Sequence, residues 1–161
     1  MLRDLIALPD HSKVWVYQSN KPFSESEKED VRYEIRQFVD NWTSHQMPVE
    51  AYGNLFHQQF IVLVANEENH AVSGCSIDSS VALINQIATK YDKDMFDRRL
   101  MCYFDKDENL LSIPMEHMAA AYEANQISDE SLFFNNLVKT KAEFLQNWIV
   151  PLKTSWHYRF V

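Results

Sequence analysis

Residues 60–64, Phe60-Ile61-Val62-Leu63-Val64, form an uninterrupted apolar run. A strand with one face in water alternates apolar and polar residues, whereas this run contains no polar residue. It therefore predicts a central strand over residues 55–65 that is covered on both faces. The polar run 66–70, which ends at His70, predicts a loop directly after it.

Two elements are predicted before this strand. Val14-Trp15-Val16-Tyr17 is β-branched and aromatic, which is typical of a short strand. Ser24 and Glu27 form a capping box, and apolar residues at helical spacing follow them, so a helix is expected there. This helix is expected to end near His45, because Pro48 disfavours helical geometry in the residue before it.

The second half of the chain predicts further helices and a hairpin. Apolar residues at helical spacing over 81–91 indicate an amphipathic helix, with Asp78 or Ser79 as its cap. Residues 100–104 and 110–113 flank a polar loop of hairpin length and predict an antiparallel pair.

The remaining residues predict two helices and an aromatic tail. One helix is expected to begin at Pro114, and another to run from Leu137 to Trp148 and to be terminated by Pro151. The tail carries Trp156, Tyr158 and Phe160 and is expected to dock on the body of the protein. Together the elements predict an α+β fold over residues 1–161, a single domain in which helices pack on one mixed sheet of about four or five strands.

Composition excludes several classes of protein. The 161 residues carry a formal net charge of −8, which repels a nucleic-acid backbone, and the longest uncharged apolar run, 60–65, is far shorter than a membrane span. The first ten residues do not have the apolar length of a signal peptide. With two cysteines in a chain large enough to fold unaided, we expect reduced thiols and a cytoplasmic protein.

The stretch 73–80 places a thiol in a turn before the predicted helix. A helix N-terminus favours the thiolate, which makes Cys75 a candidate nucleophile, with a histidine as its base. The alternative is a small buried cysteine in a turn whose serine and aspartate side chains only cap the helix. The catalytic candidates are Cys75, Ser73, Asp78, His57, His70 and His45.

The same turn could instead hold a small anion. Gly74 and the first free amides of the helix make a positive pocket, in which Ser76 and Ser79 would be further ligand-binding residues. Asp78 argues against this reading, because its carboxylate competes for those amides and repels an anion.

No metal or cofactor is predicted. Asp105, Asp107, Asn109 and Glu116 match four positions of a calcium loop, but Leu110 stands where that loop needs glycine, so a solvated hairpin loop is expected. The histidines and cysteines lack the spacing of a zinc site.

The motif Ser73-Gly74-Cys75-Ser76-Ile77-Asp78 resembles one found in a family of small bacterial hypothetical proteins, some of which are labelled ATPases of ABC transporters. The resemblance spans nearly the whole chain and implies no particular activity. In the family pattern a glycine follows the histidine of the segment Trp42-Thr43-Ser44-His45, and this chain has Gln46 at that position. The other similar segments are Val14-Trp15-Val16-Tyr17, Trp42-Thr43-Ser44-His45, Phe96-Asp97-Arg98 and Phe134-Asn135-Asn136-Leu137-Val138.

The ATPase label is excluded by the glycines. A phosphate-binding P-loop needs two glycines in a fixed frame followed by Lys and Ser or Thr, and Gly53 and Gly74 do not stand in that frame. We therefore expect a non-catalytic binding or interaction protein. Its partner would be another protein or a small anionic ligand, and a homodimer is a further expectation. The alternative is a thiol-dependent enzyme that uses Cys75 on a small acyl or phosphorylated substrate.

Overall fold

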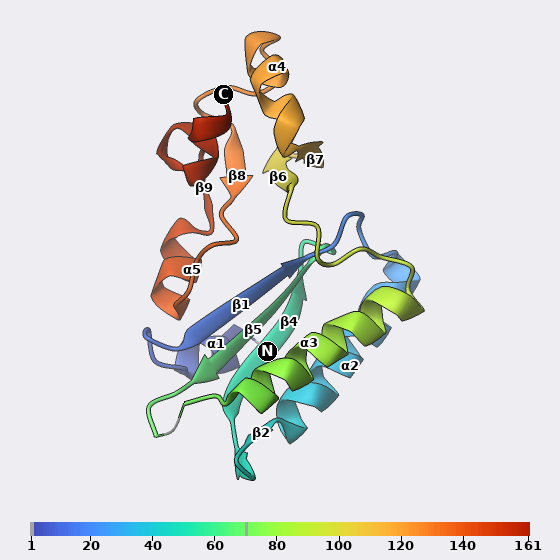
Figure 1. Cartoon of the computed structure of the whole chain (residues 1–161), viewed down its shortest axis with the longest axis vertical. Coiled ribbons are helices and arrows are strands. Elements are labelled where there is room, and N and C mark those ends of the chain that lie inside the picture. The colour runs from blue at the N-terminus through green and yellow to red at the C-terminus, as the bar shows by residue number, and fades with distance from the viewer. Residues whose placement is uncertain (1, 70) are drawn as a thin grey trace.

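The computed structural model describes residues 2–69 and 71–161, in which the strands form three antiparallel sheets (Figure 1). The first sheet has the order β1-β5-β4, with β1 at Lys13–Gln18, β4 at Glu50–Phe56 and β5 at Phe60–Asn66. The second pairs β2 (Thr43–Ser44) with β3 (Met47–Pro48). The third has the order β7-β6-β8-β9, with β6 at Leu100–Phe104, β7 at Leu110–Pro114, β8 at Leu132–Phe134 and β9 at Ile149–Pro151.

β5 is the central strand of the first sheet, as the apolar run predicted, but it begins at Phe60 rather than Leu55. Leu55 belongs to β4, because residues 57–59 turn the chain back on itself. Its residues from Phe60 to Ala65 are all buried. Successive side chains of a strand point to opposite faces, and β5 serves two cores in this way. Ile61 and Leu63 pack with the helices α2 (Glu25–Asn41) and α3 (Gly74–Lys90), which lie side by side on one face of the sheet (Figure 1).

The opposite face of the first sheet is covered by segments from both ends of the chain. Phe60, Val62 and Val64 pack there with residues of α1 (Leu2–Ala7) and α5 (Lys141–Asn147). The third sheet has its own core, shared with α4 (Met118–Glu123) and three short 3-10 helices. These are η1 (Met115–His117), η2 (Leu152–Thr154) and η3 (Trp156–Phe160).

Gln59 connects the first sheet to the third. Its buried amide Nε2 donates to the carbonyl oxygen of Ser19 at 2.9 Å and lies 3.4 Å from the Ser112 Oγ of β7 and 3.7 Å from the Cys102 Sγ of β6. A buried amide with all these neighbours fixes how the β4–β5 turn meets the β6–β7 hairpin.

The α+β class is confirmed, but the prediction of one mixed sheet is wrong. The strands pair antiparallel through short connections, such as the three-residue turn between Phe56 and Phe60, and they divide into separate sheets. The expected antiparallel pair of β6 and β7 and the capping box of Ser24 and Glu27 are confirmed.

Several predicted boundaries are wrong. α2 ends at Asn41 rather than near His45, because the chain turns directly into the β2–β3 hairpin. Its turn residues His45 and Gln46 have φ angles of 51° and 66°, the left-handed region that suits a two-residue hairpin and favours glycine. The last helix begins at Lys141 rather than Leu137.

Part of the aromatic tail docks as expected. Trp156 and Phe160 pack against the core of the third sheet, while Tyr158 stays exposed and places its ring 6.4 Å from that of Tyr122.

Candidate functional site

The turn before α3 is built as a helix cap. The Ser73 side chain accepts a hydrogen bond from the Ser76 backbone N–H at 3.2 Å, so Ser73 is the N-cap. The prediction of Asp78 or Ser79 as the cap is wrong, because the helix already begins at Gly74 and places both residues inside its first two turns. The Ser79 hydroxyl instead donates back to the Cys75 carbonyl at 3.0 Å.

Hydrogen bonds tie this cap to the end of α2. The Trp42 indole donates to the Ser76 carbonyl at 3.0 Å, and the Ser76 hydroxyl donates to the Thr43 carbonyl at 2.6 Å. The Ser44 hydroxyl accepts from the Ser73 backbone N–H at 3.0 Å. The serines of this turn therefore hold two helices and the β2–β3 hairpin together.

Cys75 is exposed at the second position of α3, next to the exposed Gly74. Asp78 is also exposed. Within the described residues neither the Cys75 thiol nor the Asp78 carboxylate has a hydrogen-bonded partner, so the turn holds no assembled nucleophile and base.

The candidate histidines lie in different places. His57 lies in the β4–β5 turn, whereas Trp42, next to the Ser73 cap, packs with Ala65 at the far end of β5. A seven-residue strand is about 20 Å long, so the structure does not bring His57 to Cys75. His45 is exposed in the β2–β3 turn, directly after Ser44, and His70 lies outside the described residues.

His57 is surrounded by aromatic rings. Its ring centroid lies 5.4 Å from that of Phe134, 5.7 Å from Phe104 and 5.8 Å from Trp148. Burial against these apolar rings lowers the pKa of His57, because the charged form would lose its water. His57 itself is exposed, so it lies at the surface of this aromatic cluster.

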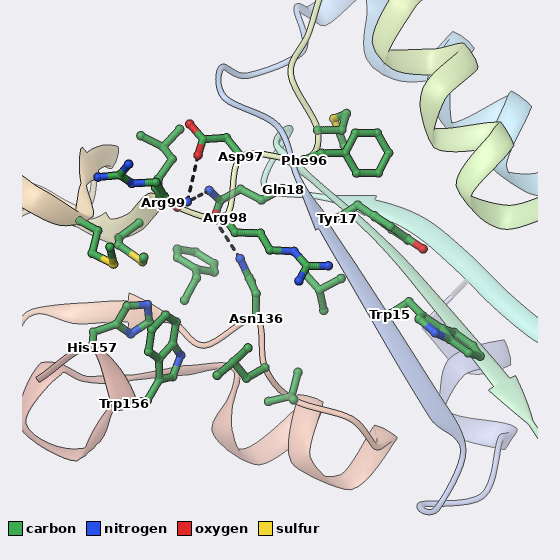
Figure 2. A pocket seen from close by; sticks show the side chains of 18 of the residues that line it. Trp15, Tyr17, Gln18, Phe96, Asp97, Arg98, Arg99, Asn136, Trp156 and His157 are labelled. Carbon is green, nitrogen blue, oxygen red and sulfur yellow. Dashed lines mark hydrogen bonds between the residues drawn. The ribbon is translucent and has the colours of Figure 1, made fainter. Parts of the chain in front are cut away.

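A cleft lies elsewhere, between the first and third sheets. Figure 2 shows this cleft, which has a volume of about 660 Å³. Four segments form its walls: β1, the connection 95–101, the loop 136–139 and residues 156–160 of the C-terminal tail. Ligand sites of small molecules commonly have volumes of 300–1,000 Å³ and lie between packed units, so the cleft has the size and position of such a site.

The charge of the cleft is opposite to that of the chain. In the described part of the chain its lining has one carboxylate, Asp97, and four basic side chains. The carboxylate accepts from the Arg99 backbone N–H at 2.9 Å. The basic residues are Arg98, Arg99, Lys139 and Arg159.

Three of these cations have no carboxylate partner within the described residues. Arg99 forms an ion pair with Glu116 at 3.3 Å, and in Figure 2 its side chain points away from the cleft. Arg98 points across the cleft in the same view, between Asn136 and Tyr17. Arg159 has only ring contacts, at 5.2 Å from the Trp156 centroid.

Trp156 and His157 form a stacked pair at the end of the cleft, with centroids 4.1 Å apart. The buried Trp156 Nε1–H has no hydrogen-bond partner among the described residues. The Nδ1 of His157 is hydrogen-bonded to the Ser155 hydroxyl. Burial, together with the nearby Arg159 charge, lowers the pKa of His157 to about 4, so its imidazole is neutral.

Sequence reasoning missed this cleft because its walls come from four distant segments. Three segments named above for an expected resemblance, 14–17, 96–98 and 134–138, supply much of the lining. They are far apart in the sequence, and only the fold shows that they meet.

The described residues support neither a metal site nor a membrane-spanning helix. Across 2–69 and 71–161, no cluster of three or more His, Cys, Asp or Glu side chains could hold a metal ion. Within the same ranges no helix combines the length and the apolar character that a bilayer span requires. Comparisons of the chain with protein-family models, with curated proteins and with solved structures find no match.

Proposed function

We propose that the protein is a non-catalytic binding protein whose ligand is a small anion held in the cleft between the first and third sheets. The observation that carries this proposal is the lining, in which one carboxylate stands beside three basic side chains without a carboxylate partner in the described residues, in a chain of net charge −8. Concentrating positive charge in a concave site of an acidic protein favours anionic ligands and disfavours cationic ones.

The free cations explain why a ligand should be held there. An arginine that makes no ion pair keeps its five donors available, and its planar fork matches a carboxylate, sulfonate or phosphate. Arg98 is such a residue, and Lys139 and Arg159 are exposed beside the same cleft without a carboxylate partner in the described ranges.

The alternative is a thiol-dependent enzyme acting through Cys75. Its support is the exposure of Cys75 at the start of α3. The geometry favours it less, because Ser73 and Ser76 are used in the cap and His57 lies at the other end of β5.

We assign the binding protein to the cytoplasm. The support for this is that Cys75 and Cys102 are both free thiols, which a reducing compartment maintains.

The proposal is tested with anilinonaphthalene sulfonate, an aromatic anion that fluoresces on binding to a protein. Arg98→Glu reverses one charge in the cleft. Arg36→Glu makes the same change at an exposed position of α2 that does not line the cleft and is the matched control. A lost charge-assisted hydrogen bond weakens binding by about tenfold or more.

We expect that weakening in Arg98→Glu and wild-type affinity in Arg36→Glu. Equal affinity of the two variants, or a wild-type protein that does not bind the probe, would contradict the proposal.

A further inference from the structure

The pairing of β1 fixes which of its backbone groups face the cleft. Ser19 N–H donates to the Gln59 carbonyl at 2.8 Å, next to β5, whereas Val14 N–H donates to the Lys139 carbonyl at 3.0 Å on the opposite side. Along a strand, successive residues direct their backbone groups to alternate sides. Odd-numbered residues of β1 therefore bond to β5, and Val14, Val16 and Gln18 direct their N–H and C=O groups away from it.

A neighbouring segment covers only one end of this edge. Residues 139–141 run antiparallel to β1, where Lys141 N–H donates to the Ser12 carbonyl at 2.8 Å. The turn at 135–138 then takes the chain away before it reaches Val16. Neither the N–H nor the C=O of Val16 has a hydrogen-bond partner among the described residues.

The other end of the free edge is bordered by the partners of the Gln18 side chain. Its side chain donates to the Leu100 carbonyl at 2.8 Å and accepts from the Asn136 amide at 2.9 Å (Figure 2). These contacts bring Leu100 and Asn136 against the edge at Gln18, so Val16 is the residue between the two bordered ends, and it lines the cleft together with Arg98.

Two further observations indicate that this edge serves a ligand. Val16 is partly buried and lines the cleft. The buried Trp156 Nε1–H, at the end of the same cleft, also has no partner in the described part of the chain. These groups match a ligand with one amide unit and carboxylates. The amide unit matches the donor and acceptor pair on Val16, and the carboxylates match the indole donor and the free cations.

Building on the proposed function, we propose that the ligand is a short acidic peptide that adds one antiparallel β-bridge to Val16. Its central residue exchanges two hydrogen bonds with the Val16 N–H and C=O, and its carboxylates contact Arg98 and the other free cations of the cleft. Because Lys139 borders the edge at Val14, and Leu100 and Asn136 border it at Gln18, about three residues fit and a long strand does not.

The experiment compares tripeptides on the full-length protein by calorimetry. The probes are acetyl-Glu-Xaa-Glu, with alanine, leucine or tyrosine at the centre and a free terminal carboxylate. Each is paired with the same peptide N-methylated on the central residue, which removes the N–H that would donate to Val16 and leaves the charge unchanged. Glutarate is the control for charge without a peptide amide.

We expect at least one acidic tripeptide to bind and its N-methylated partner to bind about tenfold or more weakly. Arg98→Glu should weaken the tripeptide, and Arg36→Glu should not. Equal binding of both members of every pair, or no tripeptide binding tighter than glutarate, would overturn the inference. If anilinonaphthalene sulfonate still distinguishes the two arginine variants in that case, the proposed function stands and only the peptide assignment fails.

Discussion

Lowering the pH from 7 to 5 should destabilise the protein through His157. This residue is 1% exposed, its imidazole is stacked on Trp156 and hydrogen-bonded to Ser155, and its pKa falls from 6.5 to about 4 in the fold. The unfolded chain binds a proton near pH 6.5, and the folded chain does not until about pH 4. The contribution of His157 to the free energy of unfolding is therefore fully present above pH 6.5 and is lost as the pH falls toward 4.

The size of the effect follows from these two values. At pH 5 the unfolded histidine is almost fully protonated and the folded one is about one-tenth protonated, so the free energy of unfolding falls by about 2 kcal/mol relative to pH 7. This is a large part of the 5–15 kcal/mol that stabilises a typical domain. His57, whose pKa burial also lowers, changes the stability in the same direction.

Urea unfolding at pH 7, 6 and 5 measures this effect. His157→Asn cannot titrate there, so it should lose about 2 kcal/mol less than the wild type over this range, whatever its stability at pH 7. Ile113→Val, in the same core, is the control: it should lower stability by about 1 kcal/mol at every pH and keep the wild-type pH dependence. If His157→Asn loses as much stability as the wild type between pH 7 and 5, His157 is not the group responsible.

Three further predictions concern the thiols, the glycines and the β2–β3 turn. Iodoacetamide should label Cys75 in the native protein and Cys102 only after unfolding, because burial removes Cys102 from solvent and raises its pKa to about 11; native labelling of Cys102, read by peptide mass spectrometry, would contradict the packing. Gly53→Ala should lower the free energy of unfolding by about 1–3 kcal/mol. Gly74→Ala, whose new Cβ meets nothing within 4 Å, should not lower it. Equal urea midpoints of these two variants would refute the close approach of α2 to β4. Gln46→Gly should raise stability by about 1 kcal/mol because residue 46 has a φ of 66°, and a lower melting temperature would refute this. The atoms that a Cβ at position 53 would meet, at 2.7–2.9 Å, belong to Ile35, Val39 and Leu63.

Sequence periodicity located the elements that depend on local chemistry. The run 60–64 predicted the central strand, since a strand buried on both faces is apolar at every position, and the run is short and rich in β-branched residues. The capping box of Ser24 and Glu27 located the start of α2, since its two hydrogen bonds join residues three apart.

What sequence could not supply is the pairing of distant segments. The sequence of an apolar strand does not indicate which other strand it pairs with. One mixed sheet was therefore as compatible with the pattern as three antiparallel sheets. The cap of α3 was assigned to Asp78 or Ser79 because both are common caps, while the bonds of Ser73 to Ser76 and Ser44 show that the helix begins earlier.

The candidate site shows the same limit. The thiol, hydroxyls and carboxylate of 73–80 drew attention because they are adjacent in sequence, yet Ser73 and Ser76 form a structural cap. The cleft combines Val16, Arg98 and Trp156, which are separated by many residues, and no spacing rule connects them.

The most direct test of the cleft as the anion site is a titration of the ¹⁵N-labelled full-length protein with anilinonaphthalene sulfonate, followed by amide chemical shifts in NMR spectra. We expect saturable shifts at Val16, Arg98 and Asn136 and at the Trp156 indole N–H, with Gly74 and Ser76 unchanged. Shifts confined to Gly74 and Ser76 would place anion binding at the start of α3 instead, and a spectrum without saturable shifts would contradict anion binding by this protein.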